Sequence, residues 1–116
     1  MSRDEEIRYY LSNLSKLDLA NSVYLFKLDF MKCSMEVIIS SIVNLYVEVN
    51  NLKEIIETRL NDKSLVLTKE EAAKQVEIFK DYAQKSKVLD KVLANDVIYD
   101  TVITGIVEVE KAKLKK

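Results

Sequence analysis

Apolar residues recur at alternating steps of four and three along the longest patterned stretch of this chain, residues 24–56. Such spacing places successive apolar residues on one side of an α-helix. It is also the heptad pattern of helices that pack lengthwise against a partner. We therefore predict one helix over residues 21–60, about 60 Å long. Its stripe, predicted to form a hydrophobic core or a dimer seam, comprises Tyr24, Leu28, Met31, Met35, Ile38, Ile42, Leu45, Val49, Leu52 and Ile56.

The middle of this long helix is apolar on further sides. Ile39, Val43, Tyr46 and Val47 widen the apolar surface beyond the stripe. A helix that is apolar nearly all round is usually buried on more than one side, so a simple two-helix hairpin would leave part of it in water. We expect further helices or a second subunit to cover it. The exposed members of these four residues are the predicted interface.

A short amphipathic helix is predicted before the long one, over residues 3–15. Ser2 followed by Glu5 is a capping box, which satisfies free amide groups where a helix starts. Polar, cap-forming side chains cluster where its apolar stripe ends, so the first turn is predicted between residues 15 and 21. Its apolar residues span a length similar to that of residues 26–37, and our hypothesis is that this helix folds back over them.

A third helix is predicted over residues 69–94. Thr68 and Glu71 form a second capping box at its start. Most of its lysines lie outside the apolar stripe and are most simply a solvated surface. The face predicted to point inward comprises Ala72, Val76, Phe79, Ala83, Leu89 and either Val92 or Leu93.

In the last segment, residues 97–114, positions 97–109 are rich in β-branched residues. A β-strand is therefore an alternative prediction for these positions. A strand here would have only residues 65–67 as a partner, which makes a poor sheet. A helix capped by Asp96 continues the three-and-four spacing, and we favour it. The chain is thus predicted to be a single all-α domain, residues 1–116, in which about four helices form a bundle that dimerisation completes.

Composition narrows the class of protein. A chain of 116 residues, 48% of them apolar, can bury one core. Its formal net charge of -1 gives no overall field that attracts nucleic acid or anionic lipid. The longest uncharged run, residues 37–47, is far shorter than the roughly 20 residues that cross a bilayer. With no secretory signal pattern at the start and one cysteine, we expect a cytoplasmic protein that does not bind membranes.

The residues needed for most catalytic sites are missing from the sequence. There is no histidine, the commonest general base and metal ligand. One glycine cannot make a glycine-rich phosphate loop. Cys33 lies among apolar residues without a histidine to activate it, so packing is its simplest role. We therefore expect neither an enzyme nor a bound metal or cofactor.

Two functions remain compatible with the sequence. The first is a helical interaction or accessory protein that associates with itself, with a dimer favoured, or with another protein. The second, less favoured, is weak nucleic-acid binding, in which affinity would fall steeply with salt. The lysines that would make that second surface are Lys80, Lys85, Lys87, Lys91, Lys113 and Lys116.

Overall fold

The computed structural model describes residues 2–17, 24–62, 64 and 66–115. These residues form four α-helices and one short 3-10 helix, with no strand among them. The all-α prediction is confirmed, and residues 97–109 are helical rather than extended. The predicted first turn lies partly outside the described residues, and Lys116 wholly so. The elements are α1 (Arg3–Leu14), η2 (Tyr24–Lys27), α2 (Met35–Asn61), α3 (Lys69–Leu93) and α4 (Asp96–Leu114).

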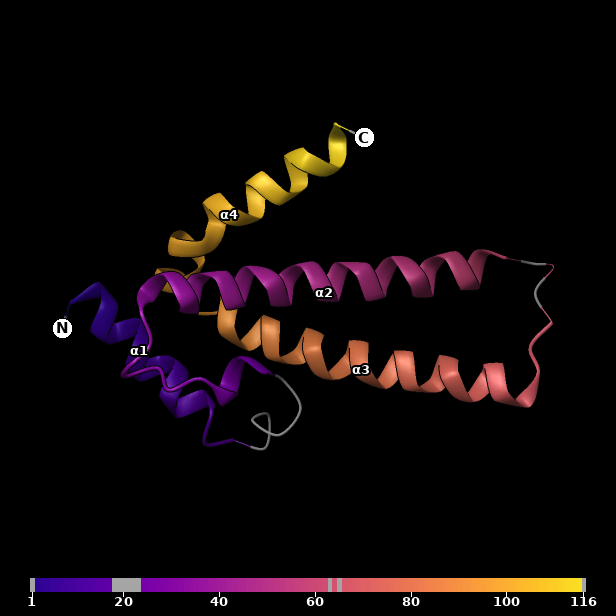
Figure 1. Cartoon of the computed structure of the whole chain (residues 1–116), viewed down its shortest axis with the longest axis horizontal. Coiled ribbons are helices and arrows are strands. Elements are labelled where there is room, and N and C mark those ends of the chain that lie inside the picture. The colour runs from indigo at the N-terminus through magenta and orange to yellow at the C-terminus, as the bar shows by residue number, and fades with distance from the viewer. Residues whose placement is uncertain (1, 18–23, 63, 65, 116) are drawn as a thin grey trace.

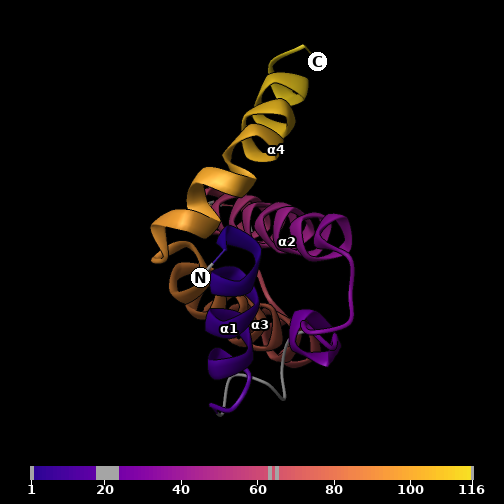
Figure 2. The ribbon, with the colours of Figure 1, turned by 90° about the vertical axis from the view of Figure 1, so that its left-hand side faces the viewer.

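Helices α2 and α3 form a long antiparallel hairpin, and the other elements gather at one end of it (Figure 1). We call that end proximal and the end at the α2–α3 connection distal. In Figure 1, α1 and η2 lie below the proximal half of the hairpin, and α4 starts there and rises away from α2. The view along the hairpin in Figure 2 shows α1 and α4 in front of it at this end. The molecule is accordingly elongated, with extents of 55 × 36 × 19 Å.

The helix starts follow the capping signals closely. Ser2 and Thr68 each accept a hydrogen bond, at 3.2 Å, from the backbone amide three residues further on. The start of α4 differs slightly from the prediction. Asn95, not Asp96, is its N-cap, and the Asn95 side-chain oxygen accepts hydrogen bonds from the next two free amides of the helix.

The long helix is shorter than predicted, because α2 begins at Met35 instead of residue 21. Ser34 caps it, accepting a 3.3 Å hydrogen bond from the amide of Val37. Before it, the Asp29 carboxylate accepts a 3.1 Å hydrogen bond from the amide of Met31, which favours a turn over a continuing helix. Met31 is 68% exposed, so its assignment to the core stripe is wrong.

From Met35 onward, the predicted stripe faces the interior of the chain itself. Five of its residues are buried, at most 7% exposed, and Met35 and Leu52 are half-buried. Leu28, before α2, is also half-buried, and the side chain of Tyr24 lies outside the described residues. The five buried stripe residues are Ile38, Ile42, Leu45, Val49 and Ile56.

Helix α1 lies against the segment before α2, as the fold-back hypothesis requires. The Arg8 guanidinium donates hydrogen bonds to the backbone carbonyls of Phe30, at 2.5 Å, and Cys33, at 2.7 Å. The Tyr10 hydroxyl donates a third hydrogen bond, 2.6 Å long, to the carbonyl of Lys91 on α3. Polar contacts therefore tie α1 to two other parts of the chain, while Ile7 and Leu11 join the same buried cluster as Phe30.

The proximal part of α4 crosses α2 at Gly105. A Cβ atom built on Gly105 would lie 2.9 Å from Cγ2 of Val43, closer than ordinary van der Waals contact. The glycine therefore serves close approach of two helices, since its backbone conformation requires no glycine. Ile98, Val102 and Ile106 of α4 are buried around this crossing.

A charge at the centre of the core should unfold the protein. Ile42 is 1% exposed, and burying an unpaired carboxylate there costs several kcal/mol, a large share of a typical folding free energy. We expect Ile42→Asp to lose its helical circular dichroism signal. Ile55→Asp, on the same helix at 45% exposure, is the control and should keep it. Equal helicity in the two variants would contradict the assignment of Ile42 to the core.

A side chain at the α2–α4 crossing should also destabilise the fold. Gly105→Val overfills the space against Val43, and we expect the free energy of unfolding to fall by about 1–3 kcal/mol. Adding Val43→Ala should recover part of the loss, because it removes the methyl groups nearest the new side chain. Urea unfolding of both single variants and the double variant measures this. Strictly additive effects would mean that the two residues are not in contact.

Candidate interaction surface

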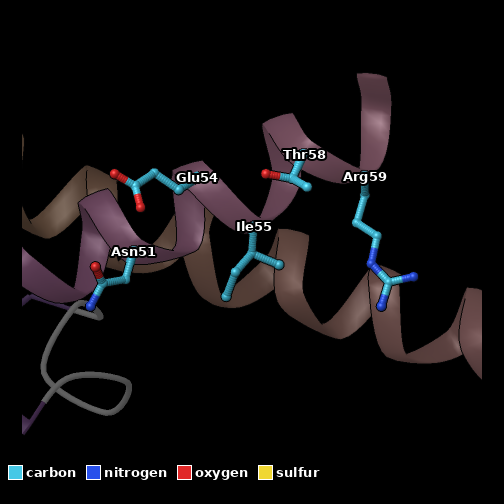
Figure 3. A pocket seen from close by; sticks show the side chains of 5 residues that line it. All are labelled: Asn51, Glu54, Ile55, Thr58 and Arg59. Carbon is cyan, nitrogen blue, oxygen red and sulfur yellow. The ribbon is translucent and has the colours of Figure 1, made fainter. Parts of the chain in front are cut away.

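The surface of α2 has a shallow, open hollow lined by residues of that helix alone. Figure 3 shows its side chains: Glu54 and Thr58 extend from the upper edge of the helix, and Ile55 and Arg59 from the lower edge. A catalytic or ligand-binding pocket normally encloses its ligand and gathers polar groups from several elements. This hollow does neither, so we do not regard it as an active site. Its residues are Asn51, Glu54, Ile55, Thr58 and Arg59.

A metal site requires clustered ligands, and a membrane span requires a long apolar helix. Within the described ranges, no group of three or more His, Cys, Asp or Glu side chains is placed so that it could hold a metal ion. Among the same residues, no helix combines the length and the apolar character needed to span a bilayer. Exposed apolar and charged side chains are the other features of the surface that could bind a partner.

Helix α4 covers most of the predicted interface on α2. Ile39, Val43 and Tyr46 are half-buried and pack against the core, and Val47 is half-buried as well. Val43 meets α4 at the glycine crossing, and the Tyr46 hydroxyl donates a 2.5 Å hydrogen bond to the Glu110 carboxylate of α4. The chain's own last helix therefore occupies much of this side of α2, and an interface formed by the exposed parts of these residues stays a prediction.

The bond between Tyr46 and Glu110 raises the pKa of the Tyr46 hydroxyl. The hydrogen bond to the carboxylate is the largest cause, and partial burial adds to it, because both disfavour the tyrosinate anion. A second polar tie, Lys113 to Glu54 at 3.9 Å, lies further along α4. These two contacts link the diverging end of α4 to α2.

The six lysines of the nucleic-acid alternative do not form one surface. Lys85 lies 3.2 Å from carboxylate oxygens of both Glu48 and Asp81. Burial alone would lower its pKa, but the bonds to the two carboxylates outweigh burial and the Lys85 pKa is raised. Lys113 is on α4, paired with Glu54, and Lys116 is outside the described residues. The exposed lysines left on one side of α3 are Lys80, Lys87 and Lys91.

The inward face of α3 differs from the predicted one in its first half. There, Gln75, Ile78 and Tyr82 are half-buried, and Tyr82 packs against the core. Val76 and Phe79, predicted to point inward, are 52% and 44% exposed. The prediction followed the most apolar side of the helix, whereas the structure turns a neighbouring, more polar side toward α2. In the second half of α3 the predicted residues Leu89 and Val92 are buried, together with Val88.

This rotation leaves apolar side chains uncovered at the distal end of the hairpin. Leu60, Val76 and Phe79 are exposed there, and Phe79 and Leu60 line a groove of about 120 Å³ between α2 and α3. No other described element reaches this end in Figure 1. We call the apolar residues at least partly exposed here the distal face, of which Ala72 is half-buried and the others are exposed: Leu60, Leu67, Ala72, Val76, Phe79 and Ala83.

The distal face was not predicted from the sequence, although the apolar character of its residues is evident there. The signal available was the apolar stripe at the start of the third helix, part of which stays exposed in the structure while Gln75, Ile78 and Tyr82 are half-buried instead. Comparison with known proteins adds no further information, since no family model, curated protein or solved structure matches the chain. The distal face is therefore the feature of the molecule that best indicates a function.

The raised pKa of Tyr46 predicts a stability loss at alkaline pH. Because the folded-state pKa exceeds the ordinary value of 10.0, the stabilisation is complete below about pH 10 and is lost as pH rises through the raised pKa. Tyr46→Phe removes this titration, so its free energy of unfolding should fall less steeply above about pH 10 than that of the parent protein. Lys85 is present in both proteins, so its titration does not contribute to the difference between their two slopes. Urea unfolding at a series of pH values tests this, and equal slopes would contradict it.

Proposed function

We propose that this protein is not an enzyme and acts by protein contact, associating with a second copy of itself through the distal face. The observation that carries the proposal is the exposed apolar surface of Val76 and Phe79, beside the groove at Leu60. Contiguous apolar surface of this kind, rimmed by polar residues, marks protein interaction sites more often than ordinary monomer surface.

The solvent-exposed area of the monomer is larger than that of a compact protein of the same mass, as expected of a protein that buries surface against a second copy. The chain exposes 7946 Å², whereas a compact monomer of 13.4 kDa is expected to expose about 6,500 Å². Its radius of gyration is 16.4 Å, against about 13 Å for a compact domain of this length. Each partner in a standard interface buries about 800 Å². The excess surface of the monomer is thus enough for one such interface.

A second copy is favoured over nucleic acid as the partner. Proteins that bind nucleic acid by charge commonly make roughly six to ten phosphate contacts. Of the six lysines predicted, only Lys80, Lys87 and Lys91 lie exposed on one side of α3, and the whole chain carries a net charge of -1. The distal face, in contrast, is mainly apolar, with Arg59 lining its groove as well, and homodimers bury surfaces of that predominantly apolar kind.

A charge on the distal face should separate the copies without unfolding either one. We expect light scattering to give the mass of two chains for the parent protein. Phe79→Glu should weaken self-association about a hundredfold or more, because a carboxylate would be buried in an apolar contact. Tyr99→Glu is the matched control. The exposed fraction of Tyr99, 45%, is similar to the 44% of Phe79, but Tyr99 lies on α4, away from the distal face.

Circular dichroism on the same samples distinguishes dissociation from unfolding. Both variants should keep the helicity of the parent protein, because each side chain is already partly in solvent, at 44% exposure for Phe79 and 45% for Tyr99. A parent protein that stays monomeric over the whole concentration range would overturn the proposal. So would a Phe79→Glu variant that associates as tightly as Tyr99→Glu.

A further inference from the structure

The apolar residues that α3 contributes to the distal face have a spacing that reads the same in both directions. Ala72, Val76, Phe79 and Ala83 follow one another at steps of four, three and four. The two outer residues are both alanine, and the two inner ones are larger. Antiparallel pairing about a twofold axis, in which residue i contacts residue j and j contacts i, matches a spacing of this kind with itself.

On the basis of the proposed self-association, we propose that two copies pair their α3 helices antiparallel, with the twofold axis between Val76 and Phe79. Ala72 of one protomer then lies opposite Ala83 of its partner, and Val76 lies opposite Phe79. Small residues at both ends of the contact allow the helix backbones to approach closely around the larger pair in the middle.

The shape of the monomer favours antiparallel over parallel pairing. Helices α1 and α4 thicken the hairpin at its proximal end only, as Figures 1 and 2 show. Antiparallel pairing of the distal ends places the two proximal ends at opposite ends of the dimer, where they do not meet. Parallel pairing would bring both proximal ends side by side, and the protruding elements would compete for the same space.

Cysteine cross-linking distinguishes these arrangements, because the chain has one cysteine, Cys33, which can be replaced by alanine. In that background, Ala72→Cys and Ala83→Cys are made singly and together. Across the proposed axis, two copies of Cys at position 72 are offset by about 16 Å along the helices, beyond disulfide reach. A cysteine at position 72 and one at position 83 of the partner are opposite each other.

We expect oxidation to leave each single variant uncross-linked and to convert the double variant to a covalent dimer of two chains. Rapid cross-linking of either single variant would show parallel pairing and overturn the inference while leaving self-association intact. A ladder of longer covalent chains would show head-to-tail contact and also overturn it, as would no cross-link in a protein that is dimeric by light scattering. A monomeric Cys33→Ala background, with the parent also monomeric, would instead overturn the proposed function.

Discussion

The rest of the structure depends on the need to cover one helix, α2, along its whole length. Its stripe must be dry, and Ile38, Ile42 and Leu45 are at most 1% exposed. The helix has 27 residues and is about 40 Å long. Only α3 follows it to the distal end, since α1, the segment around η2 and the packed part of α4 all lie at the proximal end (Figure 1). The core is therefore deep at one end of the hairpin and one layer thick at the other, and this asymmetry produces the distal face.

The sequence predicts well whatever depends on neighbours along the chain. The capping signals at Ser2 and Thr68 locate two helix starts, and the stripe from Ile38 to Ile56 identifies the buried side of α2. The same periodicity fails before Met35, where apolar residues keep the helical spacing by coincidence while the backbone turns at Asp29 and restarts at Ser34. Periodicity describes which residues would share a side if a helix formed. It carries no information on whether the helix is continuous, and with no proline or glycine in this stretch, only the turn- and cap-forming side chains of Asp29 and Ser34 mark the break.

The candidate surface could not be predicted in the same way, because it depends on which helix lies beside which. The most apolar side of the 69–94 helix is the obvious core side from sequence alone, yet Gln75 and Tyr82 lie toward α2 and Phe79 remains 44% exposed. The ion pair of Lys85 with Glu48 of α2 helps to fix this rotation, since turning Val76 inward would draw Lys85 away from that carboxylate, whereas Asp81 lies on α3 and turns with Lys85. A polar contact between helices thus selects which apolar residues become surface.

The two uncovered regions of the molecule differ in a way that bears on function. The diverging end of α4 is linked to α2 through polar contacts, Tyr46 with Glu110 and Lys113 with Glu54, at an exposed surface where such contacts contribute little free energy. Exposure of these polar groups costs little, because they are compatible with water, although Val107 and Leu114 of α4 are exposed as well. The distal face gathers apolar groups in water on two helices, and each buried square ångström of such surface is worth about 25 cal/mol. Burial of the distal face is therefore the driving force that we propose for self-association, while α4 covers part of α2 within one chain.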